Sequence, residues 1–365
     1  MATIFLTGFP GFLGSALVER LLARTPQSTT ISCLIQPKFR DLAAARAARI
    51  EEATTDQAAR IQLYEGDVTK PDLGLGRHRQ RLQEETVEIY HLAAVYDLGV
   101  ERELAMRVNV DGTRHVLAFA QACPHLHRLQ YVSTCYVSGR YPGTFTETDL
   151  SKSQTFNNHY EETKYLAELQ VQQAMAQGLP TTIYRPAIVT GDSRTGETQK
   201  YDGPLYYIRW ILRQPTPVAL LPVVGDTHTL SVNIVPRDFV IDAIAHLSGI
   251  EKSLNKVYHL CDPDPPSVAE TIDAIQAATG KYILRIPLPK ALAKGSLVYL
   301  PGMEQFMGIE PESVEYFVLS TTYTCENTLQ DLEGTGIRAP SFTSYLDRIV
   351  TFMRENPDVS SAAMV

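Results

Sequence analysis

The sequence predicts an α/β fold in which a doubly wound parallel sheet is joined to a smaller C-terminal lobe. Two observations favour this class. Short, continuously apolar segments alternate with longer helical patterns through the first half of the chain, and a glycine-rich turn follows the first apolar segment. Strands that are apolar throughout are typical of a parallel sheet covered by helices on both faces. Right-handed crossovers between such strands produce a doubly wound sheet.

The first half of the chain supplies the elements of this sheet in order. The expected strands are Thr3–Thr7, Thr30–Ile35, Ile61–Glu65, Val87–Leu92, Leu129–Ser133 and Thr181–Tyr184. The helical patterns between them are Phe12–Ala23, Asp41–Ala59, Val110–Ala122 and Tyr160–Gln177. We therefore expect residues 1–190 to form the sheet domain.

The second half loses this alternation, because Pro, Gly and Tyr cluster between residues 186 and 222. Residues 191–365 are expected to form mainly a smaller lobe, and 229–262 are expected to return to the main sheet. The elements expected there are a strand Thr229–Val235, a helix Arg237–Leu247, a strand Val257–Leu260, and helices Pro311–Leu319 and Ser341–Arg354.

Composition excludes several classes of protein. The chain has 365 residues and a net charge of −8, which disfavours a nucleic-acid binder. Its five cysteines are scattered and form no CxxC pair, so neither a zinc site nor a disulfide framework is expected. No apolar run approaches the ~20 residues needed to span a bilayer. We expect a cytoplasmic protein without a metal, either a monomer or a homodimer.

The glycine-rich turn is the first motif that carries chemistry. It lies between the first strand and the first helix, with the spacing GxxGxxG. Glycines allow a tight turn and a close approach of the backbone to a pyrophosphate, and the helix N-terminus offers free N–H groups to it. The alternative is a turn that only packs helix against strand. The candidate dinucleotide-binding residues of this turn are Gly8, Phe9, Pro10, Gly11, Phe12, Leu13 and Gly14.

The residues after the second strand favour NADP over NAD. An NAD site places an acidic residue there to bind the ribose 2′-hydroxyl. This sequence has Gln36 at the strand end, followed by Lys38 and Arg40. These cations suit a 2′-phosphate, although they could also be solvated loop charges, and NAD(H) is not excluded.

Two later strand ends complete the expected cofactor site. Asp67, followed by Val68, could accept a hydrogen bond from the adenine amino group or could simply form a turn. Ala93 and Ala94 are small enough for the dinucleotide to lie against the backbone. We expect the preceding His91 to be packed in the sheet rather than catalytic.

A Thr–Tyr–Lys group is the expected catalytic centre. Tyr160 and Lys164 are four residues apart, so both side chains lie on one face of a helix. An ammonium beside the tyrosine would lower its pKa and let it exchange a proton near neutral pH. Thr134 follows the fifth strand, at the edge where such sheets place ligands, and its hydroxyl could stabilise an oxyanion. The alternative is that Thr134 only caps a turn.

Taken together, these motifs resemble the extended short-chain dehydrogenase/reductases, with a Rossmann-type sheet. Three segments further resemble the thioester reductase and fatty acyl reductase branch. They are Gly11–Gly14, Tyr184–Gly196 and Asn233–Val240.

The resemblance implies a role for each matching residue. Tyr160 is implied as proton donor, Lys164 as the group that holds the nicotinamide ribose, and Thr134 as the group that polarises the carbonyl. Asn109 is implied to support a water relay, and Pro186 and Ile188 to lie beside the nicotinamide. The branch commonly has arginine where this chain has Gln36.

The implied function is NADPH-dependent reduction of an acyl thioester, carried by coenzyme A or a carrier protein, to an aldehyde or alcohol. Residues 139–158 and 204–222 are candidates to line the substrate pocket, although 204–222 could equally form the core of the lobe. An alternative on the same scaffold is a dehydrogenase acting on a secondary alcohol or ketone, sterol-like or lipid, or an epimerase of a sugar nucleotide. A lesser alternative is a dinucleotide-binding sensor without turnover.

Overall fold

The centre of the molecule is a seven-stranded parallel sheet with the order β11-β7-β5-β4-β1-β2-β3. This arrangement comes from a computed structural model that describes residues 2–54, 60–287 and 320–359. The strands are β1 (Thr3–Thr7), β2 (Thr30–Ile35), β3 (Ile61–Glu65), β4 (Thr86–His91), β5 (Arg128–Val132), β7 (Thr181–Pro186) and β11 (Val257–Leu260). The strand order reverses between β1 and β4, which confirms the doubly wound α/β class.

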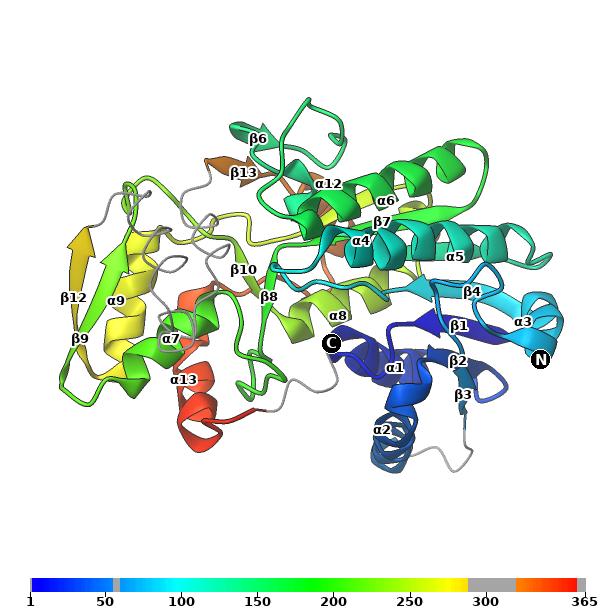
Figure 1. Cartoon of the computed structure of the whole chain (residues 1–365), viewed down its shortest axis with the longest axis horizontal. Helices are drawn as coiled ribbons and strands as arrows, with labels where there is room; N and C mark the ends of the chain where they lie inside the picture. The colour runs from blue at the N-terminus through cyan, green and yellow to red at the C-terminus, as the bar shows by residue number, and fades with distance from the viewer. Residues whose placement is uncertain (1, 55–59, 288–319, 360–365) are drawn as a thin grey trace.

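Helices cover both faces of this sheet (Figure 1). Alternate residues of each strand point to opposite faces, so Ile4 and Leu6 pack into one core while Phe5 packs into the other. On the first face lie α1 (Phe12–Arg24), α2 (Arg40–Ala53), α8 (Arg237–Leu247) and α12 (Glu326–Leu332). On the second face lie α3 (Arg79–Glu85), α5 (Gly112–Gln121) and α6 (His159–Ala176).

Element boundaries predicted for the sheet domain agree with the structure to within two residues, apart from the second helix. The helix predicted at Asp41–Ala59 ends at Ala53, and residues 55–59 lie outside the described residues. The helix predicted from Val110 emerges from a π-helical turn, Met106–Asp111, which follows the short α4 (Arg102–Ala105).

The C-terminal half forms a second core that is separate from the two faces of the sheet. Its helices are α7 (Pro204–Arg213), α9 (Val268–Thr279) and α13 (Leu346–Glu355). Parallel two-stranded sheets flank it, pairing β8 (Ile188–Thr190) with β10 (Ile234–Pro236) and β9 (Val218–Val223) with β12 (Tyr282–Pro287). A further parallel pair, β6 (Gly143–Phe145) with β13 (Thr321–Tyr323), belongs to a smaller apolar cluster formed with Val137 and Leu150. The strand predicted at Thr229–Val235 is reduced to β10, and the helix predicted at Pro311–Leu319 lies outside the described residues.

The two halves share elements at their boundary. β11 adds to the edge of the main sheet beside β7, and α8 packs against α1. The division at residue 190 stays a prediction. Within the described part of the chain, no helix combines the length and apolar character required to cross a bilayer.

Candidate active site

The backbone of the glycine-rich turn packs so closely that a side chain at Gly8 or Gly14 would collide with neighbouring atoms. Gly8 has a φ of +96°, and a Cβ atom on it would lie 2.9 Å from the Leu92 Cβ. A Cβ atom on Gly14 would lie 2.4 Å from the Gly8 carbonyl oxygen. The N–H of Gly11 donates to that same oxygen at 2.9 Å, and α1 begins at Phe12. This close backbone and the adjoining helix N-terminus fit the pyrophosphate of a dinucleotide.

The other residues of the turn shape its two sides. Phe9 is buried in the core on the sheet face that α1, α2 and α8 cover. It is joined to Pro10 by a cis peptide bond. Leu13 packs against the same core. The guanidinium of Arg237 lies 4.9 Å from the centre of the Phe12 ring, on the outer side.

The predicted 2′-phosphate residues are engaged with their own neighbours. The Lys38 ammonium lies 4.8 Å from the centre of the Phe39 ring, and the exposed Arg40 pairs with Glu65. Gln36 precedes the 3₁₀ turn that contains Lys38 and makes no capping bond through its side chain.

Arg46 on α2 is a cation that the sequence interpretation missed. Its guanidinium donates to the Pro10 carbonyl of the glycine-rich turn, and to Gln199 Oε1 at 3.2 Å. Burial lowers the pKa of Arg46, and the nearby charge of Arg49 lowers it further. Arginine therefore reaches the turn from the helix after the second strand.

Asp67 and the residues around it behave as a strand-end turn. Its carboxylate accepts hydrogen bonds from the Thr69 N–H at 2.9 Å and the Thr69 hydroxyl at 2.8 Å. Val68 packs closely over Gly112, and Ala93 donates its N–H to the Thr7 hydroxyl at 3.2 Å. The neighbouring Ala94 is half-buried. An adenine contact of Asp67 stays a prediction.

Thr134 and Tyr160 are brought together at the carboxyl end of β5. Thr134 is buried, and its hydroxyl accepts from the Tyr136 N–H at 3.2 Å and donates to the Pro186 carbonyl at 3.4 Å. Burial raises the pKa of Tyr160 to about 12, while a hydrogen bond with the Thr134 side chain lowers it. A neutral phenol beside a second hydroxyl is a suitable pair of donors for a developing oxyanion.

Lys164 lies on α6 one turn after Tyr160, but its ammonium points to β5. It donates to the Val132 carbonyl at 2.8 Å and to the Tyr131 hydroxyl at 3.2 Å. Burial lowers the pKa of Lys164 to about 8. Burial of the phenol dominates and raises the pKa of Tyr160, so the net shift is opposite to the one expected from the spacing of Tyr160 and Lys164. An effect of Lys164 on that pKa stays a prediction.

Asn109 uses its whole amide to hold the backbone of the β4–α4 loop. Its oxygen accepts from the Val95 N–H at 2.8 Å, and its nitrogen donates to the Val95 carbonyl and the Thr163 hydroxyl, each at 3.0 Å. It thereby ties the loop after β4 to α6, which carries Tyr160. A part in a water relay stays a prediction.

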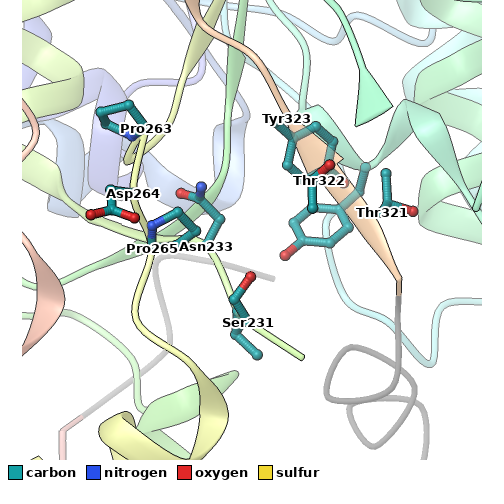
Figure 2. Close-up of a pocket in the computed structure, with 10 residues that line it drawn as sticks. Ser231, Asn233, Pro263, Asp264, Pro265, Thr321, Thr322 and Tyr323 are labelled. Carbon is teal, nitrogen blue, oxygen red and sulfur yellow. The ribbon is translucent and has the colours of Figure 1, made fainter. Parts of the chain in front are cut away.

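A cavity of about 260 Å³ opens beside the exit of β5, where the lobe meets the sheet. Figure 2 shows Ser231, Asn233 and Asp264 on one side of it and Thr321, Thr322 and Tyr323 on the other. Its lining residues are Tyr136, Ser231, Val232, Asn233, Pro263, Asp264, Pro265, Thr321, Thr322 and Tyr323.

The lining of this cavity differs from the expectation. Neither of the predicted pocket segments, 139–158 and 204–222, contributes a residue to this lining. Ile188, predicted to lie beside the nicotinamide, is half-buried on β8. Leu205, Ile208 and Ile211 of α7 instead form the core of the lobe. The lining comes from Tyr136 and from three short segments that are far apart in the sequence, so no local pattern could identify them.

Comparison with known proteins agrees with this arrangement. The profile of the family described as Male sterility protein matches residues 6–244. One of the linear gramicidin synthase proteins of Brevibacillus parabrevis is 31% identical over 283 residues, covering 74% of this chain and 5% of that protein. Fatty acyl-CoA reductase wat of Drosophila melanogaster is 29% identical over 349 residues, covering 83% of this chain and 65% of that protein.

A solved structure extends the likeness to the lobe. The terminal R domain from the myxalamid PKS-NRPS biosynthetic pathway has a TM-score of 0.80 and 28% identity, covering 98% of this chain and 91% of that chain. The chain spans less than two thirds of the length of both curated relatives. The chain therefore belongs to the Male sterility protein family, within the extended short-chain dehydrogenase/reductases, and is an oxidoreductase.

Proposed function

We propose that this protein reduces an acyl thioester with NADPH. The observation that carries the proposal is the placement of the Thr134 and Tyr160 side chains beside each other at the carboxyl end of β5, the edge of the parallel sheet at which the glycine-rich turn also lies. The likeness to a fatty acyl-CoA reductase and to reductase domains of peptide synthetases supports the thioester. NADPH would supply hydride to the thioester carbonyl carbon.

Residues of this chain would then stabilise the negative charge that develops on the carbonyl oxygen and would transfer protons. The carbonyl π electrons move to oxygen, and Thr134 and Tyr160 hold the developing oxyanion. Collapse of the tetrahedral adduct re-forms the C=O bond, breaks the C–S bond and releases an aldehyde and a thiolate, which takes a proton from solvent to become the free thiol. If a second hydride is added, Tyr160 gives the proton that completes the alcohol. Lys164 would hold the nicotinamide ribose.

The decisive experiment follows NADPH and NADH absorbance with a panel of acyl-CoAs and acyl-carrier proteins while free thiol is counted. We expect one thiol for each NADPH if the aldehyde is released, and one thiol for every two NADPH if the alcohol is formed. Cofactor binding without thiol release from any thioester would refute thioester reduction. Turnover of secondary alcohols, ketones or sugar nucleotides would then support the alternative on the same scaffold.

The choice of NADPH is expected to depend on Arg46. Arg46→Gln should weaken NADPH binding about ten- to hundredfold, because a charge-assisted hydrogen bond is worth ~1.5–3 kcal/mol, and should leave NADH binding nearly unchanged. Fluorescence titration with both cofactors measures this. Arg49→Gln is the matched control, since Arg49 is an exposed arginine on the same helix and is not among the residues predicted to bind the 2′-phosphate. Equal losses for the two cofactors would show that Arg46 does not bind the 2′-phosphate.

The cavity is expected to favour short polar acyl groups over long fatty chains. Its volume lies below the ~300–1,000 Å³ of typical ligand pockets, and Asp264, Ser231 and Thr322 line it. We expect kcat/KM for 3-hydroxybutyryl thioesters to exceed that for dodecanoyl thioesters by about tenfold or more.

A substitution tests whether the lining sets this preference. Asp264→Leu should reduce the ratio of kcat/KM for 3-hydroxybutyryl thioesters to kcat/KM for dodecanoyl thioesters, because it replaces a carboxylate of the lining with an apolar side chain. Asp273→Leu, on α9 and outside the lining, is the control. A wild-type preference for dodecanoyl thioesters would contradict this assignment of the cavity while leaving thioester reduction intact.

A further inference from the structure

The segment between β8 and α7 is held in place at both of its ends. Near its start, the Asp192 N–H donates to the Glu197 carbonyl at 2.9 Å and closes a tight turn. Arg237 of α8 lies 3.5 Å from the carboxylate of Asp192 and 3.9 Å from that of Glu197. At its far end, Tyr201 is buried in the core of the lobe, and its hydroxyl donates to the Asn356 carbonyl. The three residues between Glu197 and Tyr201 therefore start and end on fixed structure.

These three residues, 198–200, which we call the strap, contact both sides of the glycine-rich turn. Gln199 Oε1 accepts from the Arg46 guanidinium of α2 at 3.2 Å, and the same guanidinium donates to a backbone carbonyl of the turn. The Lys200 ammonium lies 5.0 Å from the centre of the Tyr96 ring. In the sheet, β1 lies between β2 and β4. Because α2 follows β2 and Tyr96 follows β4, the strap spans the carboxyl end of β1, where the glycine-rich turn begins.

The strap brings a positive charge to a turn that has none of its own. The sequence from Gly8 to Gly14 contains no charged residue, so its backbone N–H groups alone face a pyrophosphate there. Lys200 is half-buried, and its ammonium rests on an aromatic ring. A contact of this kind is weaker than a charge-assisted hydrogen bond to a phosphate oxygen. A phosphate at the turn would therefore compete successfully with the ring for this ammonium.

We propose that the strap covers the bound dinucleotide and that Lys200 binds its pyrophosphate, exchanging the Tyr96 ring for a phosphate oxygen. The pyrophosphate of a dinucleotide lies at the glycine-rich turn of such a sheet, which is the place that the strap crosses. The proposal rests on the nicotinamide dinucleotide as cofactor. It is independent of whether the substrate is a thioester, because binding of the cofactor is measured without substrate.

The alternative is that Lys200 only packs on Tyr96 and joins two loops. Two substitutions separate charge from packing. Lys200→Met keeps an unbranched stem that can still pack on the ring but removes the ammonium, whereas Lys200→Arg keeps a cation. Lys200→Met should weaken the binding of NADPH and NADH by about tenfold each, since both contain the pyrophosphate. Lys200→Arg should bind both cofactors within about threefold of the wild type.

A ligand without a pyrophosphate locates the effect. Adenosine 2′-phosphate shares the adenosine and the 2′-phosphate of NADPH, so calorimetric titration should give the same affinity for the wild type and Lys200→Met. Wild-type affinity of Lys200→Met for both cofactors would overturn the proposal. A loss for NADPH alone would place Lys200 at the 2′-phosphate, and an equal loss for adenosine 2′-phosphate would show a general disturbance of the site. Either result would overturn the assignment to the pyrophosphate.

Lys152→Met is the matched control. The Lys152 ammonium also lies over a tyrosine ring, 5.8 Å from the centre of Tyr141, but in the loop before α6. It pairs there with Asp149 at 2.7 Å. This variant should bind NADPH and NADH like the wild type, so removal of a lysine from an aromatic ring does not by itself weaken cofactor binding.

Hydrogen exchange tests whether the strap covers the cofactor. Saturating NADPH should slow amide exchange at residues 198–200 of the wild type, whereas saturating adenosine 2′-phosphate should leave the exchange at these residues unchanged. Lys200→Met, also saturated with NADPH, should show less slowing at the same residues. If NADPH protects the glycine-rich turn and leaves exchange in the strap unchanged, the strap does not cover the cofactor and the proposal is wrong.

Discussion

Replacing Tyr160 by phenylalanine is expected to lower kcat by about 10³-fold while NADPH binds with an affinity within about twofold of the wild type. A positioned general acid contributes ~10²–10⁴-fold to the rate, and Tyr160 is the group placed to give the proton beside Thr134. The substitution removes one oxygen from a half-buried side chain, so the loss should appear in kcat rather than in stability.

Tyr165→Phe is the matched control for this experiment. Tyr165 lies on the same helix, one turn further along, and its hydroxyl contacts Ser151 at the surface. It should retain wild-type activity. A Tyr160→Phe protein that keeps more than about a tenth of the wild-type kcat would identify another group as the proton donor.

The pH dependence of the reaction follows from the same geometry. Tyr160 has a pKa raised to about 12 and stays protonated throughout the working range, whereas Lys164 loses its proton near pH 8. The alkaline limb of the rate profile therefore belongs to Lys164. This differs from the sequence-based expectation of a tyrosine poised near neutral pH, because that expectation took account of helix spacing and could not include burial.

Local patterns were sufficient for the sheet and for the parts of the site that lie at strand ends. Gly8 and Gly14 were identifiable because a strand, a tight turn and a helix are consecutive in the sequence. Thr134 and Tyr160 were identifiable because parallel strands present their carboxyl ends at one edge, where helix α6 also begins. In each case the chemistry depends on neighbours that are close along the chain.

The remaining parts of the site depend on contacts between distant segments. Arg46 reaches the glycine-rich turn only because α2 runs back along the sheet, and Lys164 meets Tyr131 only because α6 packs on β5. The cavity joins Tyr136 with residues near 231, 264 and 322, which come from four separate parts of the chain. Side-chain direction in such places is set by packing, which periodicity does not encode.

The ion pair between Glu168 and Arg185 is another such contact, and it lies directly beneath the active site. Both side chains have no exposed surface, and Arg185 Nη2 lies 2.6 Å from Glu168 Oε1. Arg185 also donates to the Asp149 carbonyl at 2.8 Å and lies 3.0 Å from His259 Nε2. Ser133, next to Thr134, donates its hydroxyl to Glu168.

Removal of one partner of this pair is expected to destabilise the protein strongly. Arg185→Met should lower the free energy of unfolding by ~3–5 kcal/mol, because the Glu168 carboxylate would stay buried without its counter-charge. Arg102→Met is the control, since Arg102 pairs with Glu162 at the surface, where an ion pair contributes only ~0–1 kcal/mol. Urea unfolding at pH 7 measures both losses.

The double substitution decides whether the loss of unfolding free energy in Arg185→Met comes from the unpaired Glu168 carboxylate. Arg185→Met combined with Glu168→Met removes both charges and keeps the volume apolar, so it should be less destabilised than Arg185→Met alone. The hydroxyl of Ser133 and the imidazole of His259 would still lose a partner, so full recovery is not expected. If the double variant is less stable than Arg185→Met alone, removal of the unpaired Glu168 carboxylate costs stability instead of restoring it, and the unpaired-charge explanation is wrong.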